Sequence, residues 1–93
     1  MTDSLVARYS VSPEVVESKV GNEMVLLHLG SGTYFSLDVL GTRIWEALKV
    51  TTPLPAICAT IAGEFRVPVD QVEDDTRALL TELTDHQIIV ETQ

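Results

Sequence analysis

The sequence predicts an α+β domain in which a three-stranded antiparallel sheet is followed by three helices. Two observations predict this class. Strand-like segments joined by glycine-containing turns fill residues 15–37, and helical periodicity with capping residues follows from residue 38 onward. Strands followed by helices are typical of α+β domains. Residues 1–14 have no clear period, so we expect a loosely ordered N-terminal arm ahead of a single domain over residues 15–93.

Composition and charge limit the function. The chain has 93 residues, 45% of them hydrophobic, and one cysteine. This size suits one domain with a single modest core, and one cysteine excludes an internal disulfide. The first ten residues lack the pattern of a signal peptide, and no apolar run is long enough to span a membrane, so we expect a cytoplasmic protein. A net charge of −8 disfavours nucleic acids and anionic lipids and favours a neutral or basic partner.

The first hairpin is predicted from its two-residue loop. Residues 15–20 and 23–29 flank Gly21-Asn22, and glycine at the first loop position suits a type II′ turn. This turn sets Ser18 opposite Val25 and Val16 opposite Leu27.

The second hairpin is predicted from the three residues Gly30-Ser31-Gly32. That loop sets Leu27 opposite Phe35 and Val25 opposite Leu37. Both turns then predict one apolar face, made of Val16, Val25, Leu27, Phe35 and Leu37. The other face would carry Val15, Glu17, Lys19, Leu26, His28, Tyr34 and Ser36. In such a meander the strand Thr33–Leu37 is an edge, and its free backbone groups can pair with an extended peptide.

Three helices are predicted next. Asp38 is a good N-cap for the first, whose apolar positions are Leu40, Ile44, Trp45 and Leu48. Thr52-Pro53 predicts an N-cap and a first-turn proline for the second, with apolar positions Leu54, Ile57, Cys58, Ile61, Ala62 and Phe65. The third is expected from near Pro68–Asp70 to Asp85–Gln87, with an apolar arc of Val69, Val72, Thr76, Leu79, Leu80 and Leu83. Residues 88–90 would form a strand or a plug in the core.

A sheet with three short helices is similar in outline to a winged helix-turn-helix, which raises the possibility of DNA binding. The third helix argues against it. Its only basic residue is Arg77, set against the acidic residues Asp70, Glu73, Asp74, Asp75, Glu82 and Asp85. A recognition helix needs the opposite balance, because phosphate contacts supply most of the affinity.

Catalysis and metal binding are not predicted either. No CxxC, HExxH, GxSxG or glycine-rich phosphate loop occurs. We expect Cys58 to be a buried small side chain, His28 to be a solvated strand residue and His86 to lie at a helix C-terminus. The run Glu73-Asp74-Asp75 is expected on a solvated face, because adjacent helical positions diverge by about 100°. The sequence therefore predicts no catalytic residue, no metal site and no cofactor.

The sequence predicts different surroundings for three of the aromatic residues. Trp45 and Phe35 lie on faces predicted to be buried, so core packing is expected for both. Tyr34 is predicted on the outward face, where it either helps to hold a ligand or only packs across the strands against His28.

The order of these motifs resembles the PqqD-like family, the RiPP recognition elements that bind leader peptides of ribosomally made natural products. The resemblance covers about residues 15–90. It rests on an ordered set rather than on one diagnostic motif: Leu29, Gly32, Tyr34, Leu37, Asp38, Gly41, Ile44, Trp45, Asp75, Thr76, Leu79, Leu80 and Leu83.

The resemblance implies a non-catalytic module without a cofactor. In the family the leader peptide adds as an antiparallel strand beside the third strand, and its apolar side chains enter a cleft bordered by the third helix. Carried over, the binding residues are Thr33, Tyr34, Phe35, Ser36, Leu37, Val69, Val72, Asp75, Thr76, Leu79 and Leu83. Helical phase leaves open which flank of the arc faces the peptide. The acidic flank of Asp75 and Glu82 either pairs with a basic leader residue or only aids solubility.

The resemblance also implies partners. One setting is lasso peptide maturation, with a cysteine-protease-like leader peptidase and an ATP-dependent cyclase. The other is pyrroloquinoline quinone synthesis, with a radical SAM enzyme. We favour the lasso setting. A rival interpretation from another class is a structural domain that pairs edge to edge through Thr33–Leu37.

Overall fold

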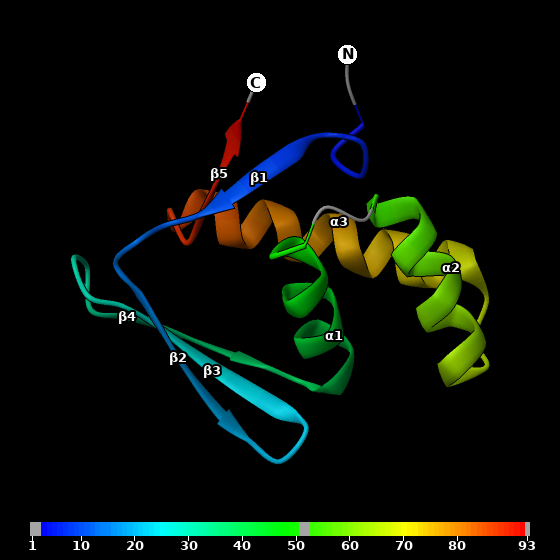
Figure 1. Cartoon of the computed structure of the whole chain (residues 1–93), viewed down its shortest axis with the longest axis horizontal. Helices are drawn as coiled ribbons and strands as arrows, with labels where there is room; N and C mark the ends of the chain where they lie inside the picture. Colours follow the sequence, from blue (N-terminus) through cyan, green and yellow to red (C-terminus); the bar gives the residue numbers. More distant parts are fainter. Residues whose placement is uncertain (1–2, 51–52, 93) are drawn as a thin grey trace.

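Five strands and three helices build the fold, which a computed structural model describes for residues 3–50 and 53–92. Their order is β1 (Arg8–Val11), β2 (Val15–Val20), β3 (Glu23–His28), β4 (Thr33–Leu37), α1 (Val39–Leu48), α2 (Leu54–Phe65), α3 (Val69–Asp85) and β5 (Ile89–Thr92) (Figure 1). The strands β2, β3 and β4 form an antiparallel sheet, and β1 pairs with β5 in a second one. The predicted α+β class, with a three-stranded sheet before three helices, is confirmed. None of the described helices is long and apolar enough to cross a membrane.

The N-terminal segment is more ordered than the sequence suggested. The prediction of a loose arm over residues 1–14 is wrong for its described part, because β1 pairs along its whole length with β5. The Ser12 N–H extends this pairing by donating to the Ile88 carbonyl at 2.9 Å. The side chain of Leu5 is only 3% exposed and belongs to the core. Ile88 and Ile89 are fully buried, so the apolar C-terminal segment contributes both a strand and a core plug.

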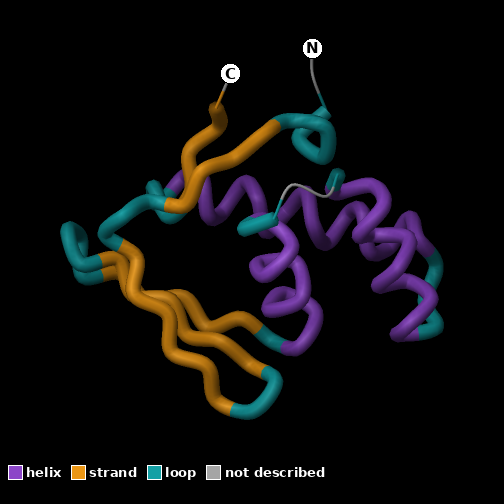
Figure 2. The backbone as a smooth tube through the Cα atoms, viewed as in Figure 1, coloured by secondary structure: helices purple, strands orange, loops and turns teal. Residues whose placement is uncertain are grey.

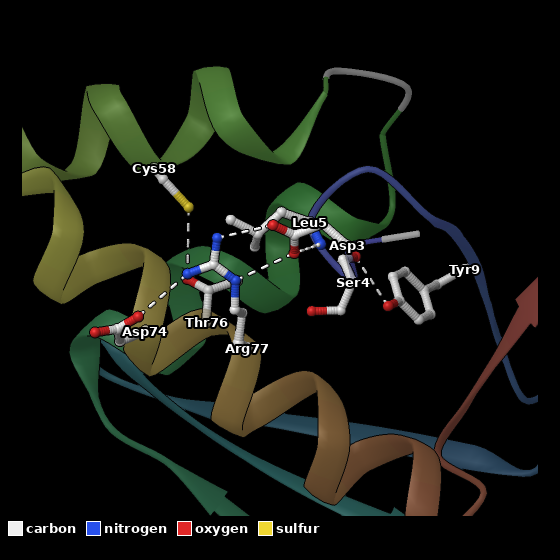
Figure 3. Close-up of polar contacts among 8 residues, drawn as sticks. All are labelled: Asp3, Ser4, Leu5, Tyr9, Cys58, Asp74, Thr76 and Arg77. Carbon is white, nitrogen blue, oxygen red and sulfur yellow. Dashed lines mark hydrogen bonds and ion pairs between the residues drawn. The ribbon is translucent and has the colours of Figure 1, made fainter. Parts of the chain in front are cut away.

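A polar clasp fastens this segment to α3 (Figure 3). Arg77 donates from Nε to Asp3 Oδ1 at 3.1 Å and from Nη2 to Asp3 Oδ2 at 2.9 Å. This guanidinium, with the Leu5 N–H, lowers the pKa of Asp3 from 3.8 to about 2. Nearby, the Tyr9 hydroxyl donates to the Ser4 carbonyl at 2.9 Å. The N-terminal segment is therefore fastened to α3 by side-chain bonds.

The first hairpin of the larger sheet has the predicted register. Ser18 lies opposite Val25 and Val16 lies opposite Leu27. Gly21 has a φ of 63°, whereas Asn22 does not have a positive φ. This is the pattern of a type II′ turn, in which only the first loop residue needs that conformation.

The second hairpin differs from the prediction by one residue. Tyr34 and Ser36 lie opposite Leu27 and Val25, where Phe35 and Leu37 were expected. The loop contains four residues, because Leu29 leaves the strand and its N–H donates to the Glu14 carbonyl at 2.9 Å. The Gly32 N–H closes the turn by donating to the His28 carbonyl at 2.7 Å.

The slip exchanges the two faces of β2 and β3. The face toward the helices carries Val15, Glu17, Lys19, Met24, Leu26, His28, Thr33, Phe35 and Leu37. The prediction that Val16, Val25 and Leu27 face the core is wrong, whereas the inward Phe35 and Leu37 are confirmed. His28 is 6% exposed and not solvated as predicted. Its Nδ1 accepts from the Ser31 N–H at 3.2 Å, and its Nε2 lies 3.7 Å from Glu14 Oε2.

Charged residues of β2 hold α1 against the sheet. Glu17 Oε1 accepts from Trp45 Nε1 at 2.6 Å and from Lys49 Nζ at 2.7 Å. These two donors lower the pKa of Glu17, with Lys49 the larger cause. The Trp45 side chain is fully buried, as predicted. The indole N–H therefore has a partner that a buried tryptophan requires.

The helices begin close to their predicted starts. Asp38 caps α1, since its Oδ1 accepts from the Gly41 N–H at 2.7 Å. For α2, Thr52 lies outside the described residues, and Pro53 is the cap residue instead of the first helical one, because its carbonyl accepts from the Ala56 and Ile57 N–H groups. Pro55 is the proline within the first turn. Helix α3 buries Val72, Thr76, Leu80 and Leu83, and Cys58 of α2 lies 3.6 Å from the Thr76 hydroxyl in the same core.

Candidate functional site

The free edge of β4 is the first part of the candidate site. Within the described residues, β4 pairs only with β3. A two-residue hairpin loop is closed by a hydrogen-bonded pair, here Val20 and Glu23, and bonded and non-bonded pairs alternate from there. Val25 is thus bonded to Ser18 on β2 and not to Ser36 on β4. Ser36 and, by the same alternation, Tyr34 direct their N–H and C=O groups away from β3, toward the open edge.

A cleft of about 390 Å³ lies at the C-terminal end of this edge. Three elements form it: the end of β4, the start of α1 and the middle of α3. Its lining residues are Ser36, Leu37, Asp38, Leu40, Gly41, Ile44, Asp75 and Leu79. Most of these residues are aliphatic, and two carboxylates and a hydroxyl add polar groups. An extended chain paired with β4 would have alternate side chains pointing toward this cleft.

Gly41 explains how α1 approaches β4 so closely. A Cβ at this position would lie 3.2 Å from Asp38 Oδ1 and 3.4 Å from Leu37 Cβ. Any larger residue would therefore crowd both the helix cap and the end of the strand. Glycine lowers helix stability, and its use in this first turn is explained by the close packing beside the cleft.

The middle of β4 contacts the C-terminal end of α3. The rings of Phe35 and His86 meet edge to face, with centroids 4.9 Å apart and planes at 69°. His86 is the cap residue at the C-terminus of α3, where the sequence predicted it. This contact fixes the C-terminal end of α3 beside the middle of β4.

Electrostatically the cleft is acidic. One carboxylate oxygen of Asp38 accepts the hydrogen bond that caps α1. Asp75 is exposed and forms none of the ion pairs found among the described residues. Its neighbour Asp74, by contrast, pairs with Arg77 at 3.1 Å. A donor group on a ligand, in particular a lysine or arginine, would find a carboxylate of Asp75 available at the edge of the cleft.

The residues expected from the sequence to bind a peptide fall into three groups. Ser36, Leu37, Asp75 and Leu79 meet in the cleft, and Thr33, Tyr34 and Phe35 continue the same strand. Val72, Thr76 and Leu83 are fully buried in the core and do not line a surface. The Thr76 hydroxyl is already used, since it donates to the Val72 carbonyl at 2.7 Å. Val69 is 39% exposed but lies outside the cleft lining.

Four cleft residues were not expected there: Asp38, which caps α1, and Leu40, Gly41 and Ile44 of that helix. The sequence correctly predicted Asp38 as a helix cap and Leu40 and Ile44 as part of an apolar helix face. Neither prediction indicates that these residues line a cleft. A glycine in the first turn of an amphipathic helix was the available clue to a close approach.

A second cavity, of about 520 Å³, lies between the N-terminal segment and the facing ends of α1 and α2. None of its lining residues belongs to β4 or α3. It is therefore separate from the edge and the cleft.

Comparison with known proteins agrees with this geometry. The family model for coenzyme PQQ synthesis protein D (PqqD) matches residues 23–89, which is well over half of the chain. Among curated proteins, none is significantly similar. The chain is similar to TbiB1, solved in complex with the TbiA(beta) leader peptide, with 38% identity and a TM-score of 0.77 over 86% of this chain and 93% of that one. It is also similar to lasso peptide synthetase B1 complexed with the leader peptide, with 26% identity and a TM-score of 0.78 over 90% of this chain and 99% of that one.

The family match spans β3, β4 and all three helices, and so includes the free edge and the elements that form the cleft. The resemblance noted from the sequence is thereby confirmed, and the chain belongs to the PqqD family.

Proposed function

We propose that this protein binds the leader segment of a ribosomally made precursor peptide and presents it to maturation enzymes. The leader would add as an antiparallel strand to β4, and its side chains would enter the cleft between β4, α1 and α3. The observation that carries the proposal is the open edge of β4 beside that cleft. Backbone pairing would supply affinity, and the cleft would supply selectivity.

The contacts divide between backbone and side chains. Tyr34 and Ser36 would bond the leader through their outward N–H and C=O groups. Leu37 and Leu79 would contact an apolar leader side chain in the cleft, and Asp75 would accept from a basic or hydroxyl-bearing one. Val72, Thr76 and Leu83 act indirectly, by holding α3 in the core.

The setting we favour is lasso peptide biosynthesis, in the cytoplasm, with a leader peptidase and a cyclase as partners. The similarity to two B1 proteins with leader peptides supports it. A second candidate is a peptide chaperone for a radical SAM enzyme in pyrroloquinoline quinone synthesis, which the family match to PqqD supports. In both settings the module itself carries out no reaction.

A proline on each sheet edge tests the docking site. Ser36→Pro removes an outward N–H from β4, whereas Lys19→Pro removes one from β2, the opposite edge, by the same alternation of pairs. Calorimetric titration would use the TbiA(beta) leader, the peptide bound by the similar protein TbiB1. We expect Ser36→Pro to weaken binding at least about tenfold and Lys19→Pro to change it less than about twofold.

The reverse order of the two variants would place the peptide on β2. Equal binding by both variants and the unchanged protein would exclude strand addition. A second titration distinguishes the two pathways. The affinity for the leader of a lasso precursor is compared with the affinity for the precursor peptide of pyrroloquinoline quinone synthesis.

A further inference from the structure

The smaller sheet has a free edge of its own. Strands β1 and β5 form a two-stranded ribbon apart from the larger sheet (Figure 2), and within the described residues β1 pairs only with β5. The Ser12 N–H donates to the Ile88 carbonyl, so these two residues form a hydrogen-bonded pair, and bonded and non-bonded pairs alternate from there. Tyr9 and Val11 of β1 therefore direct their N–H and C=O groups away from β5.

The outward N–H groups of β1 are not used elsewhere in the part of the chain that the structure describes. Among the described turn, loop and side-chain hydrogen bonds, none has the N–H of Tyr9 or Val11 as its donor. The segment just before β1 differs, because the N–H groups of Leu5 and Val6 both donate to Asp3. The edge of β1 therefore offers free backbone groups with which an extended peptide can pair.

The cavity of about 520 Å³ lies beside this edge. Ala7, Arg8 and Tyr9 line it, so the beginning of β1 belongs to both the edge and the cavity. The end of α1 and the beginning of α2 supply mainly apolar lining residues: Ala47, Leu48, Val50, Pro53, Leu54 and Pro55. The volume is typical of ligand-binding pockets. A chain paired with β1 would run along the cavity, and its side chains would alternate between the two faces of the ribbon.

The charge of this cavity is opposite to that of the leader cleft. Arg8 is the only charged residue in its lining, and Arg8 takes part in none of the ion pairs found among the described residues. The leader cleft contains the carboxylates of Asp38 and Asp75 instead. A carboxylate therefore suits the cavity and not the cleft. The net charge of −8 disfavours a strongly acidic partner, so a mainly apolar segment with a single carboxylate fits best.

We propose that the edge of β1 and this cavity form a second strand-addition site, which takes an extended, mainly apolar segment with one carboxylate from a partner protein. Tyr9 and Val11 would pair with its backbone, and the cavity with Arg8 would select its side chains. The site shares no lining residue with the leader cleft. The proposal therefore goes beyond leader binding and does not depend on it.

A selected peptide serves as the probe for this site. We would select peptides from a random display library on the full chain saturated with the TbiA(beta) leader, then synthesise the strongest binder. We expect alternating apolar residues and one aspartate or glutamate in its sequence. On its addition, amide hydrogen exchange should slow at least about tenfold at Tyr9 and Val11, because these N–H groups become bonded. It should not slow at Ile89 and Glu91, whose N–H groups point outward on β5.

Two pairs of variants provide matched controls. Arg66, at the end of α2, is also absent from the ion pairs among the described residues and lies outside the cavity lining. By calorimetric titration of the probe, we expect Arg8→Gln to weaken binding at least about tenfold and Arg66→Gln to change it less than about twofold. Val50, 57% exposed, lines the cavity, whereas Val90, 49% exposed, does not. Val50→Glu should weaken binding as Arg8→Gln does, and Val90→Glu should not.

The outcomes separate this proposal from leader binding. The proposal fails if no peptide binds the leader-saturated chain, if the leader displaces the probe, or if Arg8→Gln and Val50→Glu both bind the probe normally. A dimer of the free chain that Val50→Glu converts to a monomer would overturn the choice of partner and assign the site to a second copy. If the unchanged chain does not bind the leader, the proposed function fails alone, and the same selection on the free chain tests the second site.

Discussion

Leu79 and Leu80 are neighbours in α3 with different surroundings. Leu79 is half-buried and lines the cleft, whereas Leu80 is 1% exposed in the core. We expect Leu80→Ala to lower the free energy of unfolding by about 2–5 kcal/mol. Leu79→Ala should cost clearly less stability and instead weaken leader binding roughly tenfold, since it removes apolar contact area. Urea unfolding and calorimetric titration of both variants measure these two quantities, and a Leu79→Ala protein with normal affinity would remove this residue from the site.

Side-chain periodicity predicted the apolar arc of α3, but it did not show which flank of the arc lines the cleft. The apolar arc of α3 correctly marks the buried side, yet the candidate site needed the boundary between arc and solvent. Asp75 and Leu79 lie at that boundary, beside Thr76 and Leu80 in the core. Neighbouring positions differ by about 100°, but the exact phase depends on how α1 and β4 meet α3. That packing is a tertiary property, so the sequence alone left both flanks open.

At the scale of elements, the register of β4 shows what a pattern of hydrophobic residues can miss. The segment Met24–Leu27 is apolar at every position, so either face of β3 could turn inward. The length of the loop between β3 and β4 sets the register and therefore which face turns inward. In this loop the His28 ring accepts from the Ser31 N–H, and the Leu29 N–H donates to the Glu14 carbonyl. Counting glycines gave a loop of three residues, whereas these side-chain and backbone bonds make it four. The inward Glu17 and Lys19 were hidden because their partners are on α1, far along the chain.

The N-terminal segment is the second element that the sequence did not predict. Its strand pairs with the other end of the chain, and Leu5 packs into the core between them. We expect Leu5→Ala to lower the free energy of unfolding by about 2–4 kcal/mol, because it removes a nearly fully buried side chain. The adjacent Val6 is 61% exposed, so Val6→Ala is a matched control with an expected change within about 0.5 kcal/mol. Equal stability of the two variants would mean that the segment is a loose arm after all.

At the scale of the whole molecule, three surfaces have distinct chemistry. The free edge of β4 offers backbone groups, the cleft beside it offers aliphatic side chains and carboxylates, and the outer sheet face offers an uncharged patch. The first two meet at Ser36 and Leu37. The outer face continues from the same edge, because Tyr34 and Ser36 point their side chains toward it. One strand of five residues therefore joins all three surfaces.

The rival function, a domain that pairs edge to edge, differs from leader binding in the mass of the free protein. Two copies that each carry a net charge of −8 repel one another. We therefore expect sedimentation equilibrium to give the monomer mass of 10.2 kDa without peptide, and that mass plus one peptide after saturation with leader. A dimer at micromolar concentration that Ser36→Pro converts to a monomer would contradict this expectation, because the edge would then be occupied by a second copy before any leader arrives.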